Sequence, residues 1–247
     1  MILEFDCGNT RVKWRIREGQ NIHIKGSFLT SESFGQVLLT EIPLAGIERV
    51  LVGSVLGDEH SRGVAAWSLG RLGLNPEFAV SEPRCNGVVN GYQQPEKLGV
   101  DRWLAILAAK SKTAVGCVIV DCGSAITVDL VTSKGEHLGG YISPGLRLMR
   151  EALNIKTAGI KFGAMGYSDD VFPARNTVGA IKAAELVMMM GLVDQAKMVL
   201  RNYDSVDATL YITGGDGEWL SSMLVNSIFV EDLVLDGLGV ALEFSGH

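Results

Sequence analysis

Short apolar runs separated by polar and glycine-containing turns occur along the whole chain, and they predict an alternation of strands and helices. In the first half these runs are rich in β-branched and aromatic residues, which favour strands. The turn at Gly19-Gln20-Asn21 joins two of them into a hairpin. We expect strands at 2–6, 11–17, 21–28, 49–53 and 77–80, and helices at 31–39 and 60–72.

The second half also opens with strands and continues with helices. Its long helix begins after Asn176-Thr177 and is apolar on every side from Leu186 to Leu192, which indicates burial by other elements or by a partner subunit. Tight turns near residues 20 and 134 imply mixed sheets in both halves. We expect strands at 117–121, 125–132, 136–142 and 208–212, and helices at 146–153, 178–201 and 231–244.

A long loop at 81–100 interrupts the pattern, because two prolines and three glycines punctuate it. It contains Tyr92 and ends at Gly99-Val100-Asp101-Arg102, where an apolar helix starts. Two interpretations of Asp101 are open at this point. It suits the N-cap of that helix. It also suits a general base, with the adjacent Arg102 orienting an anionic or hydroxylated substrate.

One short pattern occurs twice, 115 residues apart. Asp6-Cys7-Gly8-Asn9-Thr10 follows one predicted strand, and Asp121-Cys122-Gly123-Ser124-Ala125 follows another. Each copy lies near the start of one half of the chain, which indicates a duplication at the scale of a domain. We therefore expect an α/β fold of two lobes, 1–114 and 115–247, which could clamp the phosphate tail of a nucleotide.

The residue types in the first copy suit phosphate and metal binding. Gly8 lets backbone N–H groups approach an anion, because no Cβ stands in the way. Asn9 and Thr10 can donate hydrogen bonds, and Lys13 can add a positive charge. Asp6, at the end of a strand, can hold Mg²⁺ directly or through water. The same letters are also ordinary turn chemistry, so a plain hairpin turn is the alternative.

Composition narrows the range of functions. The chain has 247 residues, of which 47% are hydrophobic, and a net charge of −6. These values favour a globular protein without a nucleic-acid partner, and no apolar run is long enough to cross a membrane. Neither a secretory signal, a P-loop nor a dinucleotide-binding fingerprint occurs. The four cysteines lack zinc-site spacing, so we expect reduced thiols in a cytoplasmic protein.

Taken together, these motifs resemble those of type III pantothenate kinases, bacterial enzymes of the acetate and sugar kinase/heat-shock protein/actin superfamily. The resemblance runs from end to end and rests on six motifs in the same order. Ser124 stands where the family often has Thr, which keeps the hydroxyl group. The six motifs are Asp6–Thr10, Gly99–Arg102, Asp121–Asp129, Gly139–Gly145, Asn176-Thr177 and Thr213–Asp216.

The resemblance implies an actin-like, ribonuclease H-like duplicated fold and transfer of the γ-phosphoryl group of ATP to pantothenate, the first step of coenzyme A synthesis. It implies Asp101 as the catalytic base, Asp6 as a ligand of Mg²⁺ and Asp121 as the ligand of a monovalent cation, K⁺ or NH₄⁺. It also implies a homodimer whose substrate pocket is partly closed by the partner. The implied ATP contacts are Asp6, Cys7, Gly8, Asn9, Thr10, Arg11, Val12, Lys13 and Ser124, and the implied pantothenate contacts are Tyr92, Gly99, Val100, Asp101, Arg102 and Thr177.

Two alternatives of different kinds stay open from the sequence. One is a kinase of the same superfamily that acts on another small hydroxylated metabolite. The other is a noncatalytic homologue that binds a ligand and assists transcription. The intact carboxylates Asp6, Asp101 and Asp121 argue against loss of catalysis, and the net negative charge argues against direct contact with DNA.

Overall fold

The computed structural model describes residues 1–32 and 44–243, and the chain divides into two compact units. Unit 1 comprises Met1–Ser111 together with the segment from Asp232 onward, and unit 2 comprises Lys112–Glu231. The first change of unit lies three residues before the boundary expected from the sequence. The expected second lobe ran to the C-terminus, whereas the last helix packs within unit 1.

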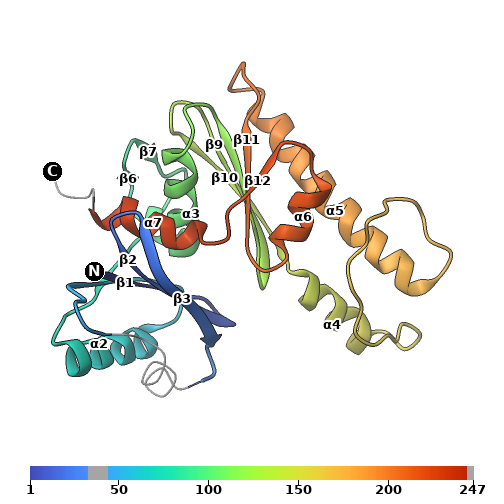
Figure 1. Ribbon diagram of the computed structural model, residues 1–247. Coiled ribbons are helices and arrows are strands. Elements are labelled where there is room, and N and C mark those ends of the chain that lie inside the picture. The colour runs from blue at the N-terminus through green and yellow to red at the C-terminus, as the bar shows by residue number, and fades with distance from the viewer. Residues whose placement is uncertain (33–43, 244–247) are drawn as a thin grey trace. The chain divides into compact units, whose positions relative to one another are not determined.

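Unit 1 is built on a five-stranded sheet of order β3-β2-β1-β4-β5. Figure 1 labels its strands β1, β2 and β3. Strands β1, β2 and β3 pair antiparallel, and β4 and β5 extend the sheet in parallel with β1. The mixed sheet expected from the turn near residue 20 is confirmed. The strands are β1 (Ile2–Cys7), β2 (Arg11–Glu18), β3 (Asn21–Leu29), β4 (Arg49–Ser54) and β5 (Glu77–Phe78).

Unit 2 repeats this topology with a sheet of order β10-β9-β8-β11-β12. Again three strands pair antiparallel, and two more extend the sheet in parallel. Two five-stranded sheets of the same connectivity confirm the duplicated fold. The strands are β8 (Cys117–Cys122), β9 (Ala125–Val131), β10 (His137–Pro144), β11 (Thr209–Thr213) and β12 (Ser227–Phe229); the short β12 was not expected from the sequence.

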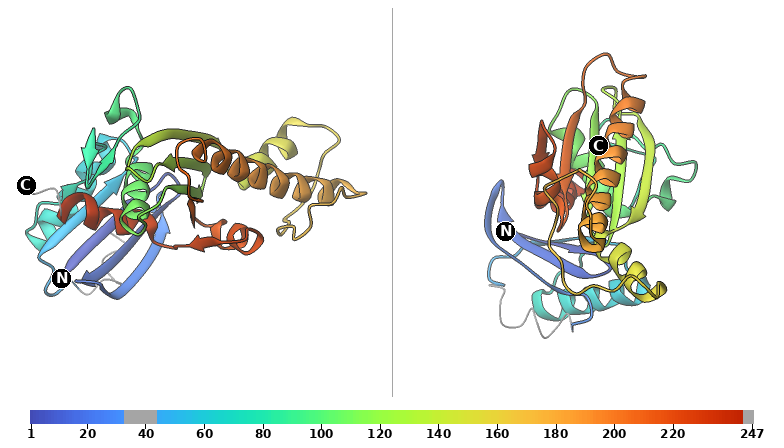
Figure 2. Two further views of the ribbon diagram at one scale, coloured as in Figure 1. Left: turned by 90° about the horizontal axis from the view of Figure 1, so that it is seen from above. Right: turned by 90° about the vertical axis from the view of Figure 1, so that its right-hand side faces the viewer.

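Helices cover the sheets. In unit 1, α2 (Asp58–Leu72) packs on one face through an apolar cluster that includes Phe5 and Trp67, whose rings meet edge to face. In unit 2, α5 (Thr177–Leu200) packs along the sheet (Figure 2). The other helices are α3 (Val100–Ser111), α4 (Leu146–Lys156), α6 (Gly217–Met223) and α7 (Leu233–Glu243).

One sequence prediction for the first half is corrected by the structure, and another lies outside the residues that the structure describes. The loop at 81–100 is not structureless, because it contains a two-stranded ribbon, β6 (Arg84–Cys85) with β7 (Val88–Val89), and a 3-10 turn, η1 (Pro95–Lys97). The helix expected at 31–39 lies almost entirely outside the described residues.

Helices α3 and α7 cross at close range on the second face of the unit 1 sheet (Figure 1). A Cβ at Gly237 would lie 2.2 Å from the carbonyl oxygen of Leu104, so the two helix backbones touch there. On the other side of α3, the Leu104 side chain fills the space left by Gly53 of β4, where a Cβ would lie 2.7 Å from its Cδ1. These two glycines set the height of α3 above the sheet.

An ionic layer holds α7 on the same face of the sheet. Glu4 is fully buried and accepts hydrogen bonds from the Nε atoms of Arg15 and Arg17. Arg15 donates at 2.8 Å to Asp236 of α7, and Arg17 donates at 2.8 Å to Glu243. Burial alone would lower the pKa of both guanidinium groups, but the carboxylates outweigh it and the pKa values are raised. Both arginines therefore stay charged and paired.

We predict that Glu4→Gln lowers the free energy of unfolding by about 3–5 kcal/mol, because two buried guanidinium groups lose their shared carboxylate. Urea denaturation followed by circular dichroism measures the change. Glu48→Gln is the control, because its side chain is 83% exposed and its loss costs little. A loss below 1 kcal/mol in Glu4→Gln would show that the layer does not hold the unit together.

Candidate functional site

The first Asp-Cys-Gly copy forms a braced turn between β1 and β2. The Gly8 amide donates to the Arg11 carbonyl at 3.0 Å, which closes the turn. Thr30, just after β3, donates its hydroxyl to the Gly8 carbonyl at 2.7 Å and its amide to the Thr10 carbonyl at 3.0 Å. No pattern in the sequence indicated this role for Thr30. Since the Gly8 N–H is used within the turn, it is not one of the donors expected to meet an anion.

The side chains suited to a ligand lie at the rim of this turn. Asn9 and Thr10 are exposed, and Asp6 is half-buried at the carboxyl end of β1. Asp6 is opposite Lys13 on β2 and opposite Gly53 on β4. Cys7 is buried, and burial, with the nearby Asp6, raises the pKa of its thiol. Cys7 therefore stays protonated and contributes its backbone rather than a reactive sulfur atom.

The start of α3 lies near the same edge of the unit 1 sheet. Leu104 packs over Gly53, the register neighbour of Asp6, and Asp101 lies about one helical turn before Leu104. Ligands of open α/β sheets bind outside the carboxyl ends of the strands. Asp6 and the first turn of α3, which carries Asp101, therefore both lie near Gly53.

Asp101 lies inside the first turn of α3 and not at its N-cap. The first helical bond runs from the Trp103 amide to the Gly99 carbonyl at 3.0 Å, so Gly99 stands in the cap position. Oδ1 of Asp101 accepts from the Arg102 amide at 2.8 Å. A Cβ at Gly99 would lie 2.6 Å from this oxygen, so a side chain there would require the Asp101 carboxylate to move. The N-cap interpretation of Asp101 is wrong.

Arg102 is a buried cation held by Tyr92. Its side chain donates from Nη1 to the Tyr92 hydroxyl at 2.6 Å, and its guanidinium carbon lies 5.5 Å from the centre of the Tyr92 ring. Arg102 is only 6% exposed. The structure thus joins two residues that the sequence placed ten positions apart. Hydrogen bonding and cation–π contact together fix the plane of the guanidinium group.

The second Asp-Cys-Gly copy forms the corresponding turn in unit 2, between β8 and β9. The Gly123 amide donates to the Ala125 carbonyl at 3.0 Å, two residues on, whereas the Gly8 amide reaches the carbonyl of Arg11, three residues on. The Ser124 carbonyl accepts from the Gly145 amide at 3.0 Å, and a Cβ at Gly145 would collide with the Gly123 carbonyl. The exposed Ser124 side chain is therefore presented on a turn that the predicted 139–145 segment supports.

The glycine turn after β11 closes against the same place. Gly214 has φ +90°, and a Cβ there would lie 2.4 Å from Oδ1 of Asp121. The Asp216 amide donates to the Cys122 carbonyl at 3.1 Å. Burial raises the pKa of the Cys122 thiol, and the negative charges of Asp121 and Asp216 raise it further. Asp121 and Asp216 therefore both lie near the Cys122 thiol at this turn.

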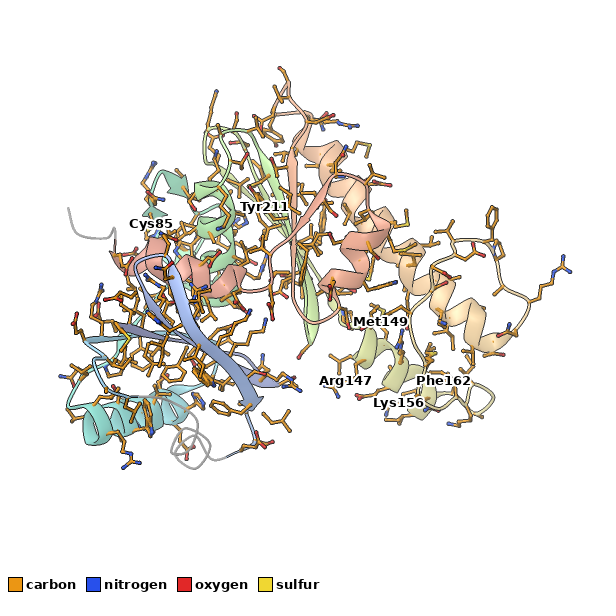
Figure 3. All side chains as sticks on the ribbon, viewed as in Figure 1. Cys85, Arg147, Met149, Lys156, Phe162 and Tyr211 are labelled. Atoms are coloured by element: carbon orange, nitrogen blue, oxygen red, sulfur yellow. The ribbon has the colours of Figure 1, made fainter. Side chains whose placement is uncertain are left out.

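A cavity of about 470 Å³ lies beside Asp216 in unit 2. Figure 3 labels two of its lining residues, Arg147 of α4 and Phe162 of the segment that follows α4. Tyr167 is another, and its hydroxyl donates to Asp216 at 2.7 Å while its ring stacks on Trp219 at 4.6 Å between centres. This hydrogen bond, with burial, raises the pKa of Tyr167 to about 12.

Arg150 ties the wall of this cavity to α5. It forms a double ion pair with the buried carboxylate of Glu185, and it donates to the Met165 carbonyl at 3.0 Å. Its guanidinium carbon lies 5.9 Å from the centre of the Tyr167 ring. The segment that carries Tyr167 is therefore held by α4, α5 and α6 together.

The predicted site residues divide between the two units. Tyr92 and Arg102 touch in unit 1, while Asp121 and Ser124 share a turn in unit 2. Thr177, also in unit 2, is the first residue of α5 and is exposed; the helix cap is Asn176, whose Oδ1 accepts from the Gly179 amide at 2.8 Å.

Three properties of the described residues bound the chemistry further. All four cysteines are buried and free of disulfides. Across residues 1–32 and 44–243, no group of three or more His, Cys, Asp or Glu residues is placed to hold a metal ion. In the same residues, no helix is long and apolar enough to cross a membrane.

Comparison with known proteins points to one family. Residues 2–198 match a family model described as type III pantothenate kinase. A type III pantothenate kinase of Cellvibrio japonicus is 39% identical over 97% of this chain and 96% of its own length. One from Pseudomonas aeruginosa is 33% identical over 98% of each chain.

Solved structures give the fold. A Baf family transcriptional activator from Campylobacter jejuni matches with a TM-score of 0.66 at 22% identity, over 98% of this chain and 97% of that one. A 2-dehydro-3-deoxygalactonokinase from Sinorhizobium meliloti matches with a TM-score of 0.57 at 13% identity, over 98% of both chains. At such low identities the likeness concerns the fold alone.

Proposed function

The chain belongs to the type III pantothenate kinase family, and from that premise we infer how its residues perform the ATP-dependent phosphorylation of pantothenate, which starts coenzyme A synthesis. The observation that carries the assignment of roles is the buried Arg102, which is fixed by Tyr92 and adjacent in sequence to Asp101. A buried, oriented cation beside a carboxylate matches a substrate that has a carboxylate and a hydroxyl group.

We propose that pantothenate binds at Tyr92, Gly99, Val100 and Arg102, with Thr177 as a further contact. Arg102 pairs with the anionic end of the substrate, and Asp101 receives the proton of the primary hydroxyl as the oxygen bonds to phosphorus. The bond between the β–γ bridging oxygen and the γ-phosphorus breaks, and ADP leaves with that oxygen. Phosphoryl transfer depends mainly on positioning, so a carboxylate at the first turn of a rigid helix suffices as the base.

The ATP phosphates are proposed to lie at the residues from Asp6 to Lys13, and Ser124 is a further contact. The exposed side chains of Asn9 and Thr10 donate to phosphate oxygens, and Lys13 adds positive charge. One carboxylate at a strand end, with the nucleotide supplying the other oxygens, fits Mg²⁺, which keeps several waters and phosphate ligands. Asp6 would hold this ion, which neutralises charge on the phosphates when bound.

The nucleoside part of ATP fits the cavity next to Asp216. Its volume of about 470 Å³ lies within the usual range for small-ligand sites. Its wall includes the Tyr167 ring and the polar groups of Arg150 and Asn154. Because the Asp216 amide is bonded to the Cys122 carbonyl, the cavity adjoins the turn that carries Ser124.

Asp121 is proposed to hold a monovalent cation, K⁺ or NH₄⁺. The fit rests on the two carboxylates near Cys122 and on the bare backbone of Gly214 against Asp121. A large, weakly hydrated cation suits carboxylate and carbonyl oxygens, and it would supply positive charge that an acidic protein lacks.

The homodimer is a further proposal, and it rests on exposed apolar side chains in unit 2. Ile155 and Phe172 are 72% and 74% exposed, and Val187 and Met188 of α5 are about half exposed. Val187 and Met188 are adjacent on α5, and exposed apolar patches mark protein interfaces. A second copy of the chain is the occupant that the family resemblance implies.

We predict that Asp101→Asn lowers kcat by about 10²–10⁴-fold, the usual effect of losing a general base. A coupled ADP-release assay with ATP, Mg²⁺ and K⁺, run with and without pantothenate, gives the rate. Asp58→Asn is a matched control, since Asp58 is also in the first turn of a helix, and it should keep full activity. A rate for Asp101→Asn near that of the unmutated enzyme would remove Asp101 from this role.

We expect the rate to require K⁺ or NH₄⁺ and to fall when Na⁺ replaces them, since Na⁺ is smaller and more strongly hydrated. Asp121→Asn should lose this dependence along with most of the activity, whereas Asp207→Asn, an exposed residue of the same unit, should keep both. Full activity of the unmutated enzyme with only Na⁺ and Mg²⁺ present would contradict the cation site.

We also expect Val187→Glu/Met188→Glu to convert a dimer into a monomer, because charges on the exposed face of α5 oppose its burial. Light scattering coupled to size-exclusion chromatography measures the mass. Val225→Glu, at a separate exposed apolar residue, should leave the dimer intact. If the unmutated chain elutes as a monomer at micromolar concentration, the proposed interface is wrong.

A further inference from the structure

One buried amide, that of Asn90, binds three separate points of the loop before α3. Its Oδ1 accepts from the Tyr92 amide at 3.0 Å. Its Nδ2 donates to the Glu82 carbonyl at 3.2 Å and to the Pro95 carbonyl at 3.3 Å. Asn90 is 7% exposed, so these bonds are made away from bulk water, where losing one costs more.

These bonds reach the residues proposed to hold pantothenate. The bond from the Tyr92 amide sets the backbone of the residue whose hydroxyl and ring fix Arg102. The bond to Pro95 holds the turn η1, whose next residue, Leu98, donates its amide to Pro95 at 3.2 Å and immediately precedes Gly99. Asn90 therefore supports the loop on both sides of its contact with Arg102.

We propose that Asn90 is a positioning residue for pantothenate recognition, which acts by fixing Tyr92 so that Tyr92 can orient Arg102. The inference rests on the proposed function, in which Tyr92 and Arg102 contact the substrate. Asn90 itself does not touch the substrate in this scheme. Its loss should weaken pantothenate binding and leave the chemical step almost unchanged, because Asp101 is carried by α3.

The chemistry of the site selects asparagine. An acceptor two residues before Tyr92 makes the turn, and serine or aspartate could supply it. The bonds to Glu82 and Pro95 need two donor hydrogens, whereas a serine hydroxyl has one and an aspartate carboxylate has none. Aspartate would also place a buried negative charge against two carbonyl oxygens. Asparagine alone of these three satisfies all three backbone groups.

The test is a double-mutant cycle between Asn90→Ala and Tyr92→Phe, read as kcat and KM for pantothenate. Each single variant should raise the KM for pantothenate about tenfold, with kcat and the KM for ATP changed less than about twofold. The double variant should raise the KM for pantothenate by far less than the product of the two single increases, because both changes release the guanidinium group of Arg102.

Two further variants separate positioning from general stability. Ser68→Ala removes another buried hydrogen bond of unit 1, to the Leu74 carbonyl at 2.7 Å, and should lower Tm without changing the KM for pantothenate. Asn90→Ser keeps an acceptor for the Tyr92 amide, and it should have a smaller effect on KM than Asn90→Ala. If Asn90→Ala does not fold, Asn90→Ser replaces it in the cycle.

The outcomes are distinct. If the two increases in KM simply multiply in the double variant, the positioning role of Asn90 is overturned. A lower Tm in Asn90→Ala with an unchanged KM would overturn it too. In both cases the proposed contact of Tyr92 with the substrate site would stand. An unchanged KM in Tyr92→Phe would instead overturn the proposed contact of Tyr92 with the substrate site, and the inference with it. A rise in KM that is confined to pantothenate, with less than multiplicative effects in the double variant, would support the role of Asn90 and the role of Tyr92 together.

Discussion

The carboxylate of Glu4 is the constraint on which the arrangement of unit 1 depends. Side chains alternate along a strand, so Glu4 and Asp6 lie on the same face of β1. That face is not an ordinary apolar core, because it carries the fully buried Glu4 and the half-buried Asp6. Instead, Glu4 gathers Arg15 and Arg17, and these two arginines bind Asp236 and Glu243 of α7. The charged layer therefore both neutralises the buried Glu4 and holds α7 against the sheet.

In unit 2, different residues lie at the positions that correspond to Glu4 and Arg15. By register, Ile119 of β8 takes the place of Glu4, and Asp129 of β9 takes the place of Arg15. Asp129 is buried and lies 3.0 Å from Nε2 of His137 on β10. The duplication therefore kept the strand–turn–strand geometry and the terminal aspartate, while the support beneath each aspartate changed. This is expected if the turn carries function and the support needs only to be satisfied.

The two turns also show how glycine is used in each copy. The amides of Gly8 and Gly123 close their own turns, so the glycines shape the site more than they bind a ligand. Gly145 and Gly214 are distant from the second turn in sequence but pack directly against it, because a side chain at either would collide with that turn. Close backbone packing of this kind fixes the conformation of the second turn.

The sequence by itself determined the strands, the repeated Asp-Cys-Gly turns and the duplicated fold, because periodicity and turn chemistry act over a few residues. It also singled out Tyr92, Asp101 and Arg102. Only the tertiary structure decided that α7 belongs to unit 1, that Gly99 precedes the helix in the cap position, and that Asn90 holds the loop. Each of these depends on a contact between residues distant in sequence or on the path of a loop backbone, and local patterns carry no record of either.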